Sequence, residues 1–307
     1  MATNTTAAAL EFPPELVTEM FSAVQGHSTL AKLCAAKPMP FAGTKSFVFS
    51  MDGEAEIVGE AEQKSPNEAA WAPVEIIPIK FVYQHRVSEE FKHLSEEARI
   101  PYLQAYADGF SKKIARGVDI AGFHAINPKT GAASTVVGNN AFDKVVNQTV
   151  SYVSGTTSPD DALDAAIQMV LGNERGMSGI AMAPLFGSAM AAVKANGVVQ
   201  YPEFRFGGRP ESFGGHALDL NTTVNKKIAA DTVRDLAIVG DFANAFRWGY
   251  AKQIPIEIIE YGDPDGLGDL KRKNQICLRS EAYVGWGILD AASFCRITEA
   301  VTAGQTA

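Results

Sequence analysis

The sequence has little of what disulfide-stabilised, membrane-bound or nucleic-acid-binding proteins need. Its three cysteines (Cys34, Cys277 and Cys295) are too few and too scattered for a disulfide framework or a zinc site, which indicates reduced thiols. Lys and Arg number 27 against 35 Asp and Glu, a net charge of −8, and no clustered basic stretch could grip phosphates. No apolar run reaches the ~20 residues that cross a bilayer, and the first nine residues lack the pattern of a signal peptide. We therefore expect no membrane partner.

Motifs for catalysis are also missing. No Gly-x-Ser-x-Gly, His-Glu-x-x-His or P-loop pattern occurs. His93, Glu96 and Glu97 have a helical spacing that could suit a metal, but zinc needs three or four convergent ligands, so a solvated helix face is the simpler interpretation. The glycine-rich segment 207–215 is not followed directly by a helix start, which favours a surface loop over a phosphate cradle. We predict no enzyme activity, no cofactor and no metal site.

The most informative feature is a pair of apolar segments around a polar tip. Residues 46–51 alternate phenylalanine and methionine with small or polar residues, and residues 71–83 carry a second apolar run. The segment between them, 59–68, is polar apart from one alanine. A two-stranded ribbon alone is marginal in water because it buries neither face. We therefore expect the ribbon to lie on another surface, with a neighbouring copy of this chain as the candidate.

Helix signals follow the ribbon. Ser88 as N-cap, followed by two glutamates, predicts one helix start. Pro101 suits the first turn of a second helix. From residue 101 to 123 apolar residues recur every three or four positions, which predicts a rod of about 35 Å. Ser158, followed by proline and two aspartates, predicts a further helix that Gly172 ends.

The remaining segments mix short helices and strands without the alternation of a doubly wound fold, which favours the α+β class. Short helices are predicted within 13–26, 28–36 and 185–195, and prolines make 37–40 extended. Strands are predicted at 179–183, 236–239 and 254–259. A final strand pair over 274–289 is expected to bend near Gly285 and Gly287.

The order of these parts resembles a known family. An N-terminal arm (12–40) precedes the hairpin with its Gly-Glu-Ala turn at 59–61, then Val-Ser-Glu-Glu-Phe at 87–91 and the long helix. The C-terminal part adds Val-Gly-Asp-Phe at 239–242, Asn-Gln-Ile-Cys-Leu-Arg-Ser-Glu at 274–281 and Gly-Ile-Leu-Asp-Ala-Ala-Ser-Phe at 287–294. Each motif alone is weak. Together and in this order, over residues 12–297, they resemble the tailed-phage major capsid proteins of the Hong Kong ninety-seven type.

The resemblance implies a structural subunit that assembles in the host cytoplasm into the icosahedral shell of a virion. In such shells the extended loop lies over a neighbouring subunit, hexamers and pentamers form around the tips of the axial domains, and double-stranded DNA fills the interior without sequence-specific binding. The expected parts are an N-terminal arm (1–44), an extended loop (45–82), a peripheral domain with the spine helix (83–151), an axial domain (152–262), and peripheral return strands with a C-terminal tail (263–307).

The resemblance also suggests partners and contact residues. Only about ten residues precede Phe12, so we expect a separate scaffolding protein or none, and we expect a portal protein. An encapsulin-like nanocompartment, which shares the fold but encloses a protein cargo, is the alternative function. Some members of the family crosslink a loop lysine to a neighbour's asparagine; Lys64 is the candidate here, although an exposed solubilising lysine is the simpler interpretation. The candidates for intersubunit contacts are Glu60, Lys64, Trp71, Arg86 and Glu89.

Overall fold

Helices and strands are mixed along the chain without regular alternation, which confirms the α+β class. The computed structural model describes residues 27–51, 55–60, 62–225 and 234–300. The elements are α2 (Thr29–Leu33), β1 (Thr44–Met51), β2 (Ala69–Ile76), β3 (Ile79–Ser88), η1 (Glu89–His93), α3 (Glu96–His124), α4 (Phe142–Val145), β4 (Thr149–Tyr152), α5 (Pro159–Gly172), β5 (Gly179–Met182), α6 (Pro184–Ala192), β6 (Lys194–Ala195), β7 (Val198–Val199), η2 (Pro202–Gly207), β8 (Ser212–Phe213), β9 (His216–Leu220), β10 (Arg234–Gly240), β11 (Phe246–Ile259), η3 (Lys271–Lys273), β12 (Gln275–Ile288), η4 (Ala291–Ser293) and β13 (Phe294–Glu299).

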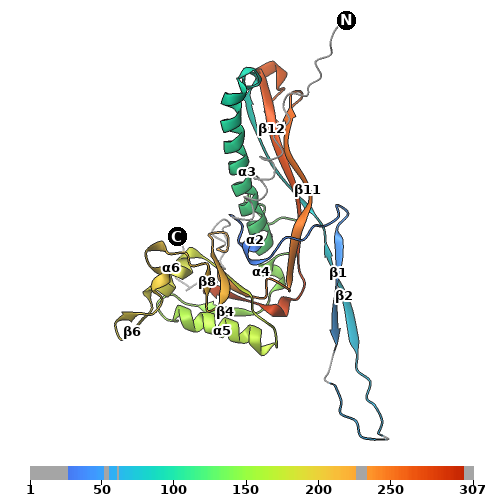
Figure 1. Cartoon of the computed structure of the whole chain (residues 1–307), viewed down its shortest axis with the longest axis vertical. Helices are drawn as coiled ribbons and strands as arrows, with labels where there is room; N and C mark the ends of the chain where they lie inside the picture. The colour runs from blue at the N-terminus through green and yellow to red at the C-terminus, as the bar shows by residue number, and fades with distance from the viewer. Residues whose placement is uncertain (1–26, 52–54, 61, 226–233, 301–307) are drawn as a thin grey trace.

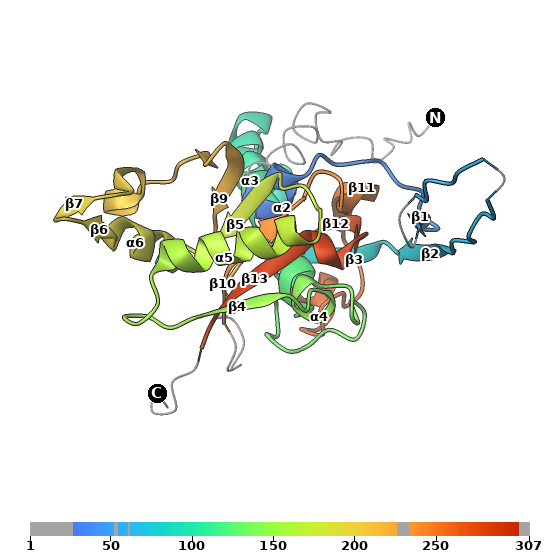
Figure 2. The same cartoon turned by 90° about the horizontal axis from the view of Figure 1, so that it is seen from below.

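Two sheets form the body, and a separate ribbon projects from it (Figure 1). The antiparallel three-stranded sheet has the order β11-β12-β3, and α3 runs along it. The six-stranded sheet has the order β4-β13-β10-β5-β9-β8, and α5 packs on β13, β4 and β10 (Figure 2). Strands β1 and β2 pair only with each other among the described strands. No helix in the described ranges is long and apolar enough to span a membrane.

The six-stranded sheet is buried on both faces. Ile180 and Met182 of β5 belong to the core under α5, whereas Ala181 belongs to the core shared with α3 and α4. This division follows from the alternation of side chains along a strand. Phe142 of α4 meets Phe294 of β13 edge to face, with the ring centroids 5.0 Å apart, and so joins the sheet to the spine helix.

Helix α3 is longer than predicted. It begins after Ser95, so Pro101 lies in the second turn instead of the first. Its 29 residues span about 44 Å at the usual rise. The predicted apolar stripe is confirmed from Leu103 onward, since the following residues are all buried: Leu103, Ala107, Phe110, Ile114, Val118 and Ala121. Because this face packs on the three-stranded sheet, α3 acts as the spine of that half of the molecule.

Other predicted helix starts are confirmed in position. Ser88 occupies the N-cap of η1, where its hydroxyl accepts a hydrogen bond from the Glu90 N–H at 3.3 Å. Ser158 occupies the N-cap of α5 with Pro159 as the first helical residue. Strand β11 begins at Phe246, eight residues before the predicted start at 254, because its first half also pairs with β12. The helix predicted within 13–26 lies outside the described residues.

The second apolar run, 71–83, is divided between two parts of the molecule. Strand β2 pairs with β1 in the ribbon, whereas β3 pairs with β12 in the body. The expectation that the whole run belongs to the ribbon was therefore wrong. The break falls at Ile77 and Pro78, and proline cannot donate the hydrogen bond that a continuing ladder would need. Ile79 and Phe81, which follow the break, pack against the main core.

The predicted strand pair over 274–289 was also wrong, because β12 is one continuous strand that runs through Gly285 and Gly287. The glycines serve a different purpose. Trp286 points into the core and is fully buried, whereas the two glycines present the opposite face of the strand. Ile76, at the base of the ribbon, fills the space that side chains would occupy there: a Cβ on Gly287 would lie 2.8 Å from Ile76 Cγ1. We call this seat the glycine notch.

Filling the notch should destabilise the subunit. We expect Gly287→Ala to lower the free energy of unfolding by about 1–3 kcal/mol, because the added methyl group overpacks against Ile76. The matched control is Gly109→Ala on the exposed face of α3, where nothing lies within 4 Å; it should raise stability by up to ~1 kcal/mol. Urea unfolding measures both. A Gly287→Ala variant as stable as the original chain would contradict the close fit.

Candidate intersubunit surface

The ribbon presents apolar side chains that the body does not cover. Its strands pair in register from Thr44 opposite Ile76 to Met51 opposite Ala69. This register puts Phe47 and Trp71 on one face, where their rings meet edge to face with centroids 5.2 Å apart. Phe47 is nevertheless 58% exposed and Trp71 67% exposed. Each ring covers only part of the other, so most of this apolar face remains open to a partner.

The ribbon is attached firmly at its base. Ile76 is fully buried in the glycine notch, and Val74 also lies beside Gly287. On β1, the Ser46 hydroxyl accepts a hydrogen bond from Arg247 Nη1 of β11 at 3.3 Å. The ribbon therefore leaves the body in a defined direction, as Figure 1 shows.

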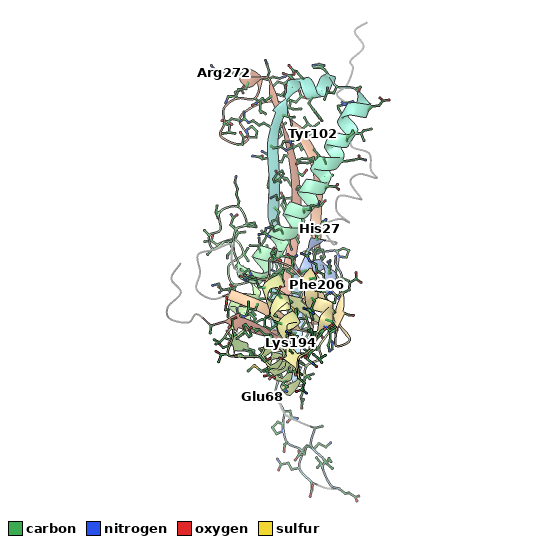
Figure 3. All side chains as sticks on the ribbon, turned by 90° about the vertical axis from the view of Figure 1, so that its left-hand side faces the viewer. His27, Glu68, Tyr102, Lys194, Phe206 and Arg272 are labelled. Carbon is green, nitrogen blue, oxygen red and sulfur yellow. The ribbon has the colours of Figure 1, made fainter. Side chains whose placement is uncertain are left out.

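Beyond the paired strands the segment 59–68 is polar, as predicted, although Ile57 before it is 99% exposed. Glu60 and Lys64 are both exposed there, and Glu68, at the start of the returning chain, lies beyond the body in Figure 3. Local hydrogen bonds shape the tip: the Glu62 carboxylate accepts from the Gly59 N–H at 2.9 Å. Glu60, Lys64 and Trp71 thus belong to one projecting element, which can present them together to another subunit.

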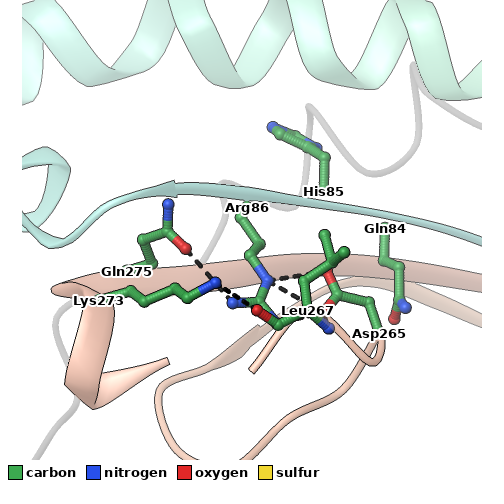
Figure 4. A pocket seen from close by; sticks show the side chains of 7 residues that line it. All are labelled: Gln84, His85, Arg86, Asp265, Leu267, Lys273 and Gln275. Atoms are coloured by element: carbon green, nitrogen blue, oxygen red, sulfur yellow. Dashed lines mark hydrogen bonds and ion pairs between the residues drawn. The ribbon is translucent and has the colours of Figure 1, made fainter. Parts of the chain in front are cut away.

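Arg86 lies in a different part of the molecule and is engaged within its own chain (Figure 4). Its side chain is only 8% exposed on β3. The Nε–H donates to both carboxylate oxygens of Asp265 at 3.0 and 2.8 Å, and Nη2 donates to Asp263 at 3.0 Å and to the Gly268 carbonyl at 2.8 Å. The hydrogen bond from Arg86 lowers the pKa of Asp265 to about 2. Arg86 therefore fixes the loop between β11 and β12.

Glu89 borders the same loop. Its carboxylate accepts a hydrogen bond from Lys271, which lowers the pKa of Glu89. The structure thus brings Arg86 and Glu89 together at one end of the three-stranded sheet and separates them from the ribbon residues. Both pair within a single subunit, and their contact with a neighbour stays a prediction.

The N-terminal arm is tied to the spine helix by a carboxylate that sequence reasoning missed. Asp119 of α3 is fully buried and accepts hydrogen bonds from Ser28 Oγ at 2.5 Å, from the Thr29 N–H at 2.9 Å and from the Leu30 N–H at 3.3 Å. Thr223 Oγ1 donates to the same carboxylate at 3.1 Å. Desolvation by burial outweighs these donors and raises the pKa of Asp119 to about 6. The position of Asp119 between two apolar residues of the helix, Val118 and Ile120, is the sequence feature that indicates a buried carboxylate.

A second carboxylate also holds the arm. We call the hydrogen bonds of both carboxylates to residues 28–32 the clasp. Asp219 of β9 accepts from Thr29 Oγ1 at 2.6 Å and from Lys32 Nζ at 2.7 Å. The predicted helix at 28–36 shortens to α2, and the chain then runs extended, as predicted, beside β11: the Met39 N–H donates to the Tyr250 carbonyl at 3.3 Å. The arm is therefore joined to both sheets and to the spine helix.

A third buried polar group joins the two halves of the body. His124 Nε2 donates to the Thr223 carbonyl at 3.0 Å, and its Nδ1 lies 3.6 Å from Asp235 and 3.7 Å from Asp143. Asp235 also accepts from Arg296 at 2.9 Å, and burial raises its pKa. His124 is only 2% exposed, so a substrate cannot reach it. The described part of the chain contains no group of three or more His, Cys, Asp or Glu residues arranged to hold a metal.

Comparison with known proteins agrees with this geometry. The model of the phage capsid family matches residues 10–298, nearly the whole chain. The chain belongs to the phage capsid family. A solved structure from Mycobacterium phage Ogopogo aligns with a TM-score of 0.76 and 33% identity, covering 89% of this chain and 92% of that one. One from Gordonia phage Cozz aligns with a TM-score of 0.75 and 27% identity, covering 90% and 87%.

More distant likenesses show the shared fold alone. The capsid of a native GTA particle aligns with a TM-score of 0.62 at 13% identity, covering 98% of this chain and 96% of that one. A search of curated proteins finds no match. The predicted Hong Kong ninety-seven-type fold and the predicted function as a major capsid protein of a viral shell are confirmed. No comparison supports the encapsulin-like alternative.

Loosening the clasp should expose the arm. In Asp119→Asn an amide NH2 replaces an acceptor among converging donors, so at least one hydrogen bond is lost at a cost of about 1–3 kcal/mol. We expect trypsin to cut the isolated subunit faster after Lys32, which α2 protects in the original chain. Asp108→Asn, on the exposed face of α3, is the control. Mass spectrometry measures the cleavage rate of the original chain and of both variants. Equal rates for all three proteins would show that Asp119 does not hold the arm.

Proposed function

We propose that this capsid subunit builds its shell by laying the β1–β2 ribbon across an adjacent copy, and that the shell encloses a double-stranded DNA genome. The exposure of Phe47 and Trp71 on one face of the ribbon carries the proposal. Aromatic side chains are enriched among the residues that dominate binding energy at interfaces. A two-stranded ribbon also needs a further packed surface to be stable, and an adjacent copy supplies it.

The predicted contact residues take different roles in this proposal. Trp71 supplies apolar area, whereas Glu60 and Lys64 form a charged rim at the tip. Exposed charges of this kind contribute little binding energy and mainly orient the partner. Arg86 and Glu89 act indirectly by holding the loop between β11 and β12 in shape. We assign Lys64 to the solvated rim and not to a covalent crosslink.

The division into an arm, an extended loop, and peripheral and axial domains is part of the proposal. Strand pairing supports two changes to the expected boundaries. The extended loop would end near residue 78, because β3 pairs with β12 in the body. The axial domain would end near residue 245 instead of 262, because β11 pairs with β12 along most of its length.

Family membership supports the remaining partners. We propose that a portal protein and a scaffolding protein take part in assembly in the host cytoplasm, and that the subunit catalyses no reaction. The net charge of −8 supports a wall that does not grip the phosphates of its cargo.

The double variant Phe47→Ser, Trp71→Ser tests the ribbon. Both side chains are largely exposed in the subunit and pack mainly on each other, so its free energy of unfolding should fall by no more than ~1.5 kcal/mol. Removing ~1.4 kcal/mol of contact energy weakens an association constant tenfold. The yield of closed particles in electron micrographs should therefore fall at least about tenfold. Val136→Ser, which removes another exposed apolar side chain outside the ribbon, is the control. Normal assembly of the double variant would overturn the proposal, and an unfolded one would place the ribbon in its own subunit's core.

A further inference from the structure

One aromatic residue far from the ribbon is held in an unfavourable state. Phe206, in η2, has φ +57° and ψ +28°, a left-handed conformation that residues other than Gly, Asn and Asp adopt rarely. Its side chain is 98% exposed. The left-handed backbone costs free energy in the isolated subunit, and such strain persists mainly where the surroundings or a function require it.

The surrounding turn explains how Phe206 is turned outward. Phe204, two residues earlier, is 2% exposed, and its ring lies 5.4 Å from that of Phe213. After Phe204 the chain kinks at Arg205 and Phe206, and the Gly208 N–H donates to the Arg205 carbonyl at 3.0 Å. A Cβ on Gly208 would lie 2.1 Å from the Glu203 carbonyl oxygen, so the turn closes too tightly for any other residue. The outward position of Phe206 is therefore built into the fold.

The exposed ring is also oriented. The Arg205 guanidinium lies over it, 5.0 Å from the ring centroid. Such a contact between a cation and an aromatic face is attractive. Because the turn fixes the backbone of Phe206 before any partner arrives, less conformational entropy remains to be lost on binding.

We propose that Phe206 is a preorganised aromatic anchor that packs against an adjacent copy of this chain in the shell. The inference rests on the proposed function, since it names the residue by which the axial-domain tips, where copies are expected to meet, hold one another. Phe206 is absent from the contact residues that the sequence suggested.

The position of Phe206 supports a second copy as the partner. It belongs to the tip lobe (residues 184–213: α6, β6, β7, η2 and β8), which lies at the opposite end of the body from the ribbon in Figure 2; Figure 3 labels Phe206 and Lys194 on this lobe. A closed ring of identical subunits brings two different patches together at each contact. A subunit with protruding apolar groups at opposite ends meets that requirement.

The charges near the tip lobe support the same partner. Exposed cations occur at Lys194, Arg205 and Arg209. Carboxylates gather around Tyr201, where Asp160, Asp164 and Glu203 raise the pKa of the phenol together with burial, which is the larger cause. Because both signs are present, cations of one lobe can pair with carboxylates of the next copy. Electrostatic complementarity of this kind fixes orientation between subunits.

Two substitutions distinguish the contribution of the backbone conformation at Phe206 from that of its ring. Phe206→Asn keeps a residue that tolerates the left-handed conformation but removes the ring, whereas Phe206→Tyr keeps the ring. We expect the isolated Asn variant to melt at a temperature equal to or above that of the original chain, because asparagine relieves the backbone strain and the exposed ring contributes little to the fold. Its yield of closed particles should fall at least tenfold. The Tyr variant should assemble within twofold of the original. Val136→Asn, which removes an exposed apolar side chain outside both the tip lobe and the ribbon, is the control and should assemble normally.

The outcomes distinguish the anchor from the ribbon. Normal assembly of Phe206→Asn, with failure of the Phe47→Ser, Trp71→Ser variant, would overturn the anchor and leave the ribbon proposal standing. Normal assembly of both would overturn both. A lowered melting temperature of Phe206→Asn would also overturn the anchor, because the ring would then serve the subunit's own fold.

Discussion

Three consecutive residues of β12 hold the parts of this subunit together. Trp286 points into the core, where its indole N–H donates to the Asn140 carbonyl at 2.9 Å and its carbonyl accepts from the Asn140 side chain at 2.7 Å. The glycines on either side leave the opposite face of the strand bare, and Ile76 of the ribbon and Met39 of the arm fill it. The spine helix, the ribbon and the arm thus all depend on one strand with a large side chain on one face and none on the other. A side chain at either glycine would separate the ribbon from the body that aims it.

The subunit has well-packed cores but exposes aromatic side chains at its two ends. The main core and the core under α5 are closed, and the buried polar groups inside, such as Asp119 and His124, are tied to several elements each. By contrast, the ribbon and the tip lobe each leave aromatic surface in water. Such a division suits a protein that must fold as a single copy and then gain further stability only through contact with others. Interfaces concentrate their binding energy in few well-placed groups, and a rigid base for each group limits the entropy lost on assembly.

Local sequence patterns predicted the helices and strands, but contacts between distant residues determine which parts of the molecule they pack against. The stripe along α3 and the Ser158–Pro159 helix start were predictable because the signals lie within a few residues. The break at Pro78 was missed because the apolar run continues on both sides of it, although one side belongs to the ribbon and the other packs in the subunit's own core. The partners of Arg86 lie about 180 residues away, and its engagement with them could not be read from its neighbours in the sequence. The outward turn of Phe206 depends on the closure at Gly208, which is a property of three-dimensional packing.

Tryptophan fluorescence tests the central claim, that the ribbon is completed by another copy, without altering the chain. The sequence has three tryptophans; Trp248 and Trp286 are at most 1% exposed, and Trp71 is 67% exposed. Quenching by iodide should therefore affect only Trp71 in the free subunit. On assembly we expect this quenching to disappear and the emission to shift to shorter wavelength, because Trp71 becomes buried against a neighbour. A Trp71 that is as accessible to iodide in closed particles as in the free subunit would contradict the account.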